Sequence, residues 1–303
     1  MNLYSFMKNV YMKMYLVGFF NRLPDYIFIP FIYRMSTGKR LDLKEPVTFN
    51  EKIQWLKLYD HNPLYMQLSD KYRVRSYVEE KIGNGFLIPL LGKWNSVSEI
   101  DFDNLPNQFV LKCNHDSGGI VICTDKRIFD IKKAKEKLNH HLAQNYYYMS
   151  REWAYKDIKP CIICEKYLFD EKTHDLRDYK FFCFNGMPKL IQVDFNRFID
   201  HKRNIYSLDW ELQDLTIKCP NDPKVIIEKP PNLDEMIEIA KKLSAGIPEV
   251  RVDLYSVNGK TYFSEMTLYH GSGIEKFSSQ ELAEKMGSWI DLSLAYKEES
   301  VTE

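Results

Sequence analysis

Apolar residues recur every three or four positions in several stretches of the chain, a spacing typical of helices that pack by one face. One such face consists of Val74, Tyr77, Val78 and Ile82. It predicts a helix over residues 65–82, ended by Gly83, which readily adopts the left-handed backbone of a helix end. The same reasoning predicts helices over residues 130–144 and 233–243 and a helical extension over residues 1–45.

A further helix is predicted by the residues that would cap its N-terminus. Thr48 and Glu51 have the spacing of a capping box, in which each side chain bonds the backbone N–H of the other residue. Val47 precedes them as a candidate hydrophobic staple. We therefore expect a helix from this point to about residue 59.

Short apolar runs bounded by turn residues predict the strands. They lie at residues 109–113, 120–123, 161–168, 179–184, 189–194, 250–255 and 261–266. Two Asn-Gly pairs, at 185–186 and 258–259, separate the last four runs into hairpins. Strands mixed with helices and joined as hairpins predict an α+β fold with antiparallel sheets.

Composition narrows the function and the compartment. The chain has 303 residues and no net charge, from 42 basic and 42 acidic side chains, whereas nucleic-acid binding needs a basic excess or stripe. Cys161 and Cys164 form a CxxC pair, but no second ligand pair follows, so we interpret most of the six cysteines as small buried hydrophobes and expect reduced thiols. We expect a cytoplasmic protein.

The N-terminal 40 residues have two interpretations. Their apolar positions have helical spacing, but the longest apolar run, residues 14–20, is too short to span a bilayer. Helices packed on the main body are one interpretation, and the one that we prefer. A peripheral contact with the inner face of the membrane, through an aromatic and basic face, is the other.

The segment from Lys112 to Gly119 is the first candidate for chemistry. Lys112 ends an apolar run and meets a loop of small and hydrogen-bonding residues. Backbone N–H groups of such a loop can approach a phosphate, and a lysine adds positive charge. A solvated hairpin loop explains the same pattern.

Charged residues inside two predicted strands form the second candidate. Asp253 and Glu265 lie amid apolar neighbours on the two arms of the second hairpin. Buried carboxylates must be paired or bind a cation, so they could hold Mg²⁺ or could bond to Arg251. If only Asn258 and Gly259 formed the loop and both arms were regular, the two carboxylates would point to opposite faces.

One extra residue in the hairpin removes this conflict. We predict a three-residue loop of Val257, Asn258 and Gly259, with a bulge at Gly259. A bulge elsewhere in either arm would give the same shift. Asp253 would then lie opposite Glu265, with Arg251 and Thr267 on the same face.

The end of the 161–168 strand is the third candidate. Free backbone groups after a strand can bind an adenine edge, and this strand ends in Glu165, Lys166, Tyr167 and Leu168. Asp178 and Lys180 share one face of the next strand. Surface ion pairs explain these residues equally well when each is taken alone.

The order of these segments resembles the TupA-like ATP-grasp family of bacterial surface-polysaccharide clusters, whose members are often labelled glycosyltransferases. The resemblance covers about residues 30–290 and is carried by FVLKCNHDSG, SREW, DYKFFCFNG, RVDLY and YHGSG. It implies an ATP-grasp fold in which two α+β lobes grip ATP. The regions would be a helical extension (1–45), a helical region (46–107), a small lobe with a lid loop (108–168) and a C-terminal lobe with the metal site (169–303).

The resemblance also implies a role for each candidate residue. ATP phosphates would contact Lys71, Lys112 and the lid loop with Asn114, Ser117, Gly118 and Gly119. The adenine hinge would be Glu165, Lys166, Tyr167 and Leu168, with Asp178 at the ribose. The γ-phosphate would be reached by Lys180 or by Lys202 and Arg203. Mg²⁺ would be bound by Asp253, Glu265 and Thr267, and Arg251 would stabilise an acyl phosphate.

The family often has proline where this chain has His270. We interpret this as a tolerated loop change, with an added substrate contact as the alternative.

The implied reaction is an ATP- and Mg²⁺-dependent, ADP-producing ligation. A carboxylate on a glycan or small molecule would be activated as an acyl phosphate and joined to an amine. A glycosyltransferase and a sugar kinase on the same fold are the alternatives. The pair Asp101 and Asp103 is a poor nucleotide-sugar motif, since turn-forming Asn104 and Pro106 follow it.

Overall fold

The computed structural model describes residues 18–171, 176–195 and 201–296. Its helices are α2 (Asp25–Thr37), α3 (Phe49–Tyr59), α4 (Leu64–Ser69), α5 (Val74–Ile82), α6 (Ile131–Leu142), α7 (Tyr147–Ser150), α8 (Leu233–Ser244) and α9 (Gln280–Ser288). Its strands are β1 (Leu90–Trp94), β2 (Phe109–Cys113), β3 (Ile120–Cys123), β4 (Ile162–Lys166), β5 (Asp178–Phe184), β6 (Met187–Phe195), β7 (Lys202–Tyr206), β8 (Glu249–Val257) and β9 (Lys260–Thr267). Short 3-10 turns include η1 (Phe19–Arg22), η5 (Trp153–Tyr155) and η6 (His270–Gly273).

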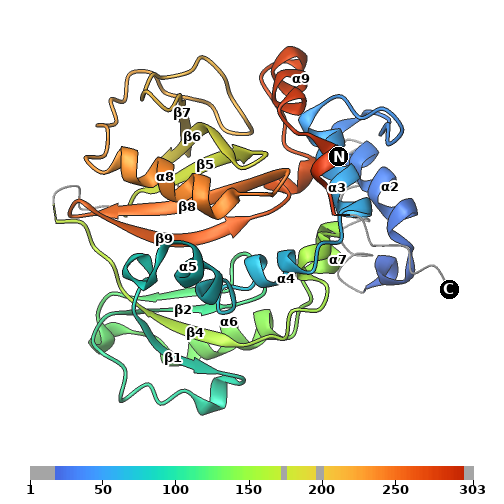
Figure 1. The fold of residues 1–303 in the computed structure, drawn as a ribbon. Helices are drawn as coiled ribbons and strands as arrows, with labels where there is room; N and C mark the ends of the chain where they lie inside the picture. Colours follow the sequence, from blue (N-terminus) through green and yellow to red (C-terminus); the bar gives the residue numbers. More distant parts are fainter. Residues whose placement is uncertain (1–17, 172–175, 196–200, 297–303) are drawn as a thin grey trace, which may run out of the picture.

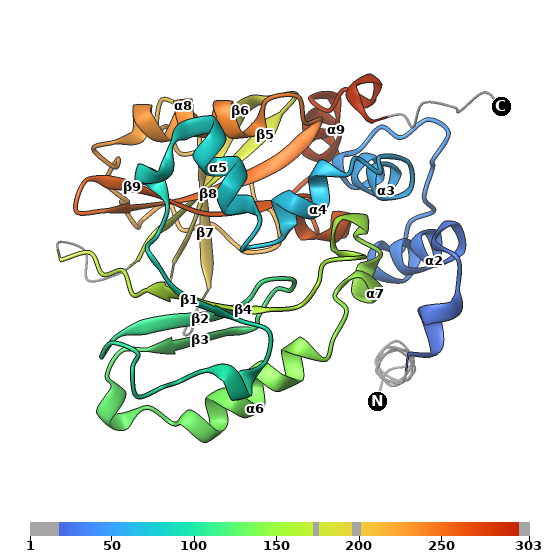
Figure 2. The ribbon, with the colours of Figure 1, turned by 60° about the horizontal axis from the view of Figure 1, so that its bottom comes forward.

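Two antiparallel sheets form the two lobes (Figure 1). The small lobe has the strand order β1-β4-β2-β3, and the large lobe has the order β7-β6-β5-β8-β9. Helix α6 covers the face of the small sheet that is turned away from the large lobe (Figure 2), and α8 packs on β5, β6 and β8. The predicted α+β class is confirmed.

Burial along the strands explains this layering. All seven residues of β5 are buried because β6 and β8 flank it and its two faces are covered. Alternate residues of β2 are buried, as expected for a strand with one covered face. Strand β1 comes from the region 46–107 and pairs with β4, so the sheet of the small lobe begins before residue 108.

Most predicted helices are confirmed, and one is wrong. The capping box of Thr48 and Glu51 begins α3, and α6 and α8 lie where the periodicity places them. The stretch 65–82, however, is two helices. The Asp70 carboxylate accepts the backbone N–H groups of Tyr72 at 2.8 Å and Arg73 at 3.1 Å, so it competes with a continuous helix.

The N-terminal extension packs on the body over its described part, residues 18–45, as predicted, while residues 1–17 lie outside the described residues. Arg151 donates to the carbonyl of Phe20 at 2.6 Å and lies 3.2 Å from the carboxylate of Asp25. The outer side of α2 exposes Tyr26 and Phe31. Within the described residues, no helix is long and apolar enough to cross a bilayer. A peripheral membrane contact stays a prediction.

Candidate active site

The hairpin of β8 and β9 brings the predicted site residues of these strands to one face. Asp253 lies opposite Glu265, and Arg251 lies opposite Thr267. The predicted three-residue loop is wrong, because the last pair before Asn258 and Gly259 is Val257 with Lys260. The shift occurs instead at Ser264, where a bulge separates the pairs Asp253–Glu265 and Leu254–Phe263. The alternative of a bulge within an arm is confirmed.

Arg251 is the centre of the contacts on this face. Its Nε and Nη2 donate to the Asp253 carboxylate at 2.7 and 2.6 Å, and Nη2 also donates to the Thr267 hydroxyl at 3.0 Å. The Glu265 carboxylate lies 3.6 Å from Nη2. Burial lowers the pKa of Arg251, but Asp253 more than offsets burial and the pKa is raised. The guanidinium is therefore a fixed positive charge.

Lys180 of β5 shares the same carboxylate. Its ammonium donates to Asp253 at 2.6 Å and also contacts Asp178. Burial raises the pKa of Asp253, but Arg251 and Lys180 outweigh burial and the pKa is lowered. Lys180 lies opposite Asp253 because β5 and β8 pair in that register. Its predicted contact with the γ-phosphate and the ribose contact of Asp178 stay predictions.

The predicted Mg²⁺ ligands differ in how far they are available. Asp253 has no exposed surface, and both of its oxygens accept hydrogen bonds from cations. The Glu265 side chain is 39% exposed and faces the pocket with Thr267. Among the described residues, no group of three His, Cys, Asp or Glu side chains could hold a metal. Glu265 and Thr267 fit Mg²⁺, which takes oxygen ligands and keeps several waters, whereas Asp253 in this arrangement holds Arg251 and Lys180 in place.

Lys112 and the adenine-hinge residue Glu165 contact each other in the small lobe. The Lys112 ammonium lies 2.7 Å from the Glu165 carboxylate, and Arg75 lies 3.2 Å from the other oxygen. Burial lowers the pKa of Lys112, but Glu165 outweighs it and the pKa is raised, so the ammonium is charged. Sequence reasoning missed Arg75, which periodicity places on the helix α5 without any further signal.

The hinge residues connect the two lobes. Lys166 ends β4 and is exposed, and Tyr167 is half-buried. Leu168 is buried in a small apolar cluster with Ile88 and Val257, which belongs to β8 of the large lobe. The segment is thus placed between the sheets, where an adenine hinge is expected, although its role stays a prediction.

The loop 114–119 has a buried base and an exposed tip. The Asn114 amide donates to the carbonyl of Lys159 at 3.1 Å and accepts the backbone N–H of Cys161 at 2.7 Å. That side chain therefore fixes the loop, and its predicted contact with phosphate is not supported by this geometry. Only Ser117 and Gly118 are exposed.

Lys71 and the end of this loop lie together. The backbone N–H of Lys71 donates to the carbonyl of Asn114 at 3.0 Å, and its ammonium contacts the carbonyl of Asp116. A Cβ at Gly119 would lie 2.7 Å from the Asp116 carboxylate, so only glycine fits there. The break between α4 and α5 is what directs Lys71 toward the loop.

Lys202 and Arg203 lie on β7, at the edge of the large sheet. Arg203 donates to the Asp194 carboxylate at 2.8 Å and lies 3.4 Å from Glu275. Neither residue lines the pocket described below. A contact with the γ-phosphate is therefore not supported for either residue.

His270 is buried and links Arg251 to Glu275. Its Nδ1 accepts from Nη1 of Arg251 at 2.8 Å, and its Nε2 lies 3.3 Å from the Glu275 carboxylate. Burial lowers the pKa of His270 to about 4, so the ring is neutral at neutral pH. The side chain therefore helps to hold Arg251 in place, and the tolerated loop change and the added substrate contact both stay predictions.

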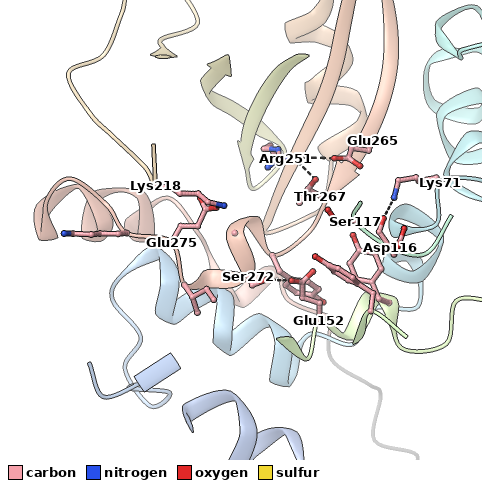
Figure 3. A pocket seen from close by; sticks show the side chains of 16 residues that line it. Lys71, Asp116, Ser117, Glu152, Lys218, Arg251, Glu265, Thr267, Ser272 and Glu275 are labelled. Atoms are coloured by element: carbon pink, nitrogen blue, oxygen red, sulfur yellow. Dashed lines mark hydrogen bonds and ion pairs between the residues drawn. The ribbon is translucent and has the colours of Figure 1, made fainter. Parts of the chain in front are cut away.

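A pocket of about 580 Å³ opens between the loop and the β8–β9 face (Figure 3). Of the predicted site residues, it is lined by Lys71, Ser117, Arg251, Glu265 and Thr267. Sequence reasoning missed other lining residues, chiefly Tyr146, Glu152, Tyr155, Lys218, Ser272 and Glu275. No sequence pattern predicts Lys218 as a lining residue. It is placed there by its left-handed backbone, with φ 64°, and by the hydrogen bond from its backbone N–H to the carbonyl of Lys276. Lys112, Lys180 and the hinge lie outside this pocket.

Solved structures similar to this one include several ligases. A D-alanine–D-alanine ligase from Bacillus anthracis complexed with ATP is 15% identical, with a TM-score of 0.41 over 76% of this chain and 64% of that chain. The enzyme of the same name from Helicobacter pylori is 13% identical, with a TM-score of 0.42 over 80% and 69%. An N5-carboxyaminoimidazole synthetase from Staphylococcus aureus is 15% identical, with a TM-score of 0.37 over 67% and 44%. The chain thus spans about half to two thirds of the length of these structures.

No curated protein matches the chain. The sequence profile of one family, described as TupA-like ATP-grasp, matches residues 51–291, which is most of the chain. The match confirms the resemblance drawn from the sequence segments and the ATP-grasp fold class. The chain belongs to the TupA-like ATP-grasp family.

Proposed function

We propose that the chain is an ATP-dependent carboxylate–amine ligase that works through an acyl phosphate and modifies a bacterial surface polysaccharide or its precursor in the cytoplasm. One observation carries the proposal. A single pocket is lined by four cations, Lys71, Lys218, Arg251 and Lys276, and also by Glu265, Thr267 and the carboxylate of Glu152. Such a pocket can receive an anionic phosphate and a second substrate together.

The roles of the chain's own residues follow from this arrangement. Arg251 is held by Asp253 and His270, so its guanidinium is preorganised for negative charge that develops on a transferring phosphate. Mg²⁺, when bound by Glu265 and Thr267, supplies further charge neutralisation. The exposed tip of the loop, Ser117 and Gly118, is suited to close over the pocket and exclude water.

The glycosyltransferase alternative has less support. Asp101 accepts the backbone N–H of Asp103 at 3.0 Å and the amide of Asn104 at 2.6 Å, which makes a closed surface turn. Neither aspartate lines the pocket. A sugar kinase would use the same cations and differs only in the acceptor.

The test is a coupled assay of ADP release over a panel of uronic-acid glycans and amino acids. We expect ADP release that requires both a carboxylate and an amine, with an amide as product. A phosphorylated sugar formed without any amine would establish the kinase, and UDP release from a nucleotide sugar would establish the glycosyltransferase. Either result would overturn the ligase.

A further inference from the structure

One buried carboxylate in the pocket wall has no part in the phosphate side of the site. Glu152 follows α7, is only 5% exposed and lines the pocket (Figure 3). Its Oε1 accepts from the hydroxyl of Ser150 at 2.8 Å and from that of Ser272. Within the described residues, Oε2 has no hydrogen-bond partner. Oε2 is not one of the fully buried side-chain atoms that lack a partner, and Glu152 lines the pocket, so this oxygen can accept a hydrogen bond from a bound molecule.

The backbone explains why Glu152 faces the pocket. The preceding residue, Arg151, has a left-handed backbone at φ 57° and turns its side chain away, to the carbonyl of Phe20 and to Asp25. Two adjacent buried charges therefore point in different directions. Arg151 cannot compensate Glu152, since its guanidinium is used by the N-terminal extension.

The nearest buried ammonium, Lys57, does not fill the gap either. Its hydrogen bonds go to the carbonyls of Ser272 at 2.7 Å and Ser150 at 3.1 Å and to the Gln54 amide at 3.2 Å. Burial lowers the pKa of Lys57 to about 8, although Glu152 counteracts this. The lysine balances the charge of Glu152 at a distance and leaves Oε2 open to the pocket.

We propose that Glu152 binds the amino group of the acceptor substrate, as its ammonium form, through Oε2. The inference rests on the proposed ligase function and adds the chemical class of the acceptor and its place in the pocket. Tyr146 and Tyr155 line the same region, and aromatic rings favour a cation. Arg251 and Lys71 line the pocket away from Glu152 (Figure 3), and their positive charge disfavours an ammonium beside them.

This position also gives the acceptor's proton a destination. The ammonium transfers one proton to the Glu152 carboxylate, and the neutral amine then attacks the carbonyl carbon of the acyl phosphate. A C–N bond forms, the C–O bond to phosphate breaks, and inorganic phosphate leaves with the second proton of the amine, as hydrogen phosphate. Burial raises the pKa of Glu152, which makes the carboxylate a better proton acceptor than an exposed one.

The experiment measures binding, so it does not depend on turnover. The full-length protein with ADP and Mg²⁺ is titrated calorimetrically with glycinamide, L-alaninamide, L-lysine and ethanolamine, each as the free amine and as its N-acetyl form. We expect the wild type to prefer at least one free amine. Glu152→Gln removes the charge-assisted bond, and we expect it to weaken binding of that amine by roughly ten- to hundredfold while leaving the acetylated form unchanged.

Three matched variants separate binding from folding. The double variant Lys57→Met/Glu152→Gln leaves no buried lysine without a counter-charge. We expect it to lose the preference for the free amine over the acetylated form, as Glu152→Gln alone does. Lys57→Met alone keeps it. Asp60→Asn also keeps it, because that buried carboxylate lies outside the pocket and contacts Tyr65 at 2.8 Å.

The assignment is overturned if the wild type does not distinguish any free amine from its acetylated form, or if the Glu152 variants keep the preference. The ligase proposal fails separately, through the absence of carboxylate- and amine-dependent ADP release.

Discussion

The two lobes differ in how their buried cations are compensated. At the small lobe, Lys112 of β2 and Arg75 of α5, a helix that packs on α8, share the single carboxylate of Glu165, at 2.7 and 3.2 Å. Two cations against one carboxylate leave an excess of one positive charge beside the hinge. In the large lobe, Arg251 and Lys180 share Asp253, and Lys180 also contacts Asp178. Glu265 also lies 3.6 Å from Arg251, so two cations face three carboxylates and no positive charge is in excess.

The difference indicates two kinds of contribution to a phosphate site. The small lobe has an excess positive charge that a bound anion can neutralise. If one of its two cations is removed, the other still forms an ion pair with Glu165. The large lobe is a closed network that sets the position of Arg251, so losing one carboxylate leaves buried cations short of a partner. Function should be sensitive in the first region, and folding in the second.

Removal of the central carboxylate of the large lobe should have the largest effect. Asp253→Asn leaves Arg251 and Lys180 with a neutral partner, and breaking a buried ion pair in this way costs about 3–5 kcal/mol of unfolding free energy. Urea unfolding should show the loss without added nucleotide. An unchanged unfolding midpoint would mean that the network does not hold the large lobe together.

Removal of the excess cation of the small lobe should affect binding instead. In Lys112→Met, Glu165 keeps its pair with Arg75, so the melting temperature without nucleotide should hardly change. The stabilisation by nucleotide, about 2.7 kcal/mol at a hundred times Kd, should disappear. Lys93→Met on β1 of the same sheet is the matched control, since Lys93 is exposed. Equal stabilisation of the Lys112 variant and the wild type would rule out the phosphate role.

The register of the second hairpin shows what the sequence can and cannot predict. The period of two along a strand is strict, so the need to place Asp253 and Glu265 on one face demanded one extra residue. Its location was not determined, because a bulge at any point of either arm gives the same shift. Because Asn258 and Gly259 favour a tight two-residue turn, the extra residue is accommodated within an arm, as a bulge at Ser264.

Tertiary contacts explain what was missed in the pocket. Lys71 was predicted as a site residue, but the helix break that directs its side chain to the loop was not predicted. The break depends on hydrogen bonds from the backbone to the Asp70 side chain, which form only once the chain turns there. Glu152 belongs to the SREW segment, to which no role was assigned, and Lys218 comes from a segment without any motif, so the two residues meet only in the fold. No periodicity or motif brings such residues together.

His270, which contacts Arg251 of the large-lobe network, should make the stability of the protein depend on pH. His270 is neutral in the folded state, with a pKa of about 4, whereas an unfolded histidine titrates near 6.5. The unfolded chain therefore binds more protons as the pH falls below 6.5, and stability is lost toward pH 4. From pH 7 to 5 the loss should be about 2 kcal/mol.

The variant His270→Gln isolates this contribution. Glutamine can still accept from Arg251 but does not titrate, so the difference in unfolding free energy between pH 7 and 5 should shrink. The Glu275 carboxylate also has a lowered pKa, through His270 and Lys218 against burial, but its loss of stability falls mainly below pH 4.5. The same pH dependence in variant and wild type would assign the effect to another group.

The smallest change in stability is expected at the other carboxylate of the hairpin. Glu265 lies directly opposite Asp253, yet its side chain is 39% exposed and it approaches Arg251 only at 3.6 Å. Glu265→Gln should therefore change the unfolding free energy by no more than about 0.5 kcal/mol. The same variant should weaken the effect of Mg²⁺ on nucleotide binding, because it removes the charged oxygen ligand that faces the pocket. Titration of nucleotide with and without Mg²⁺ checks both statements on one sample. If Glu265→Gln destabilises the protein as much as Asp253→Asn, the two carboxylates serve one structural network, and the division between an open ligand and a buried scaffold is wrong.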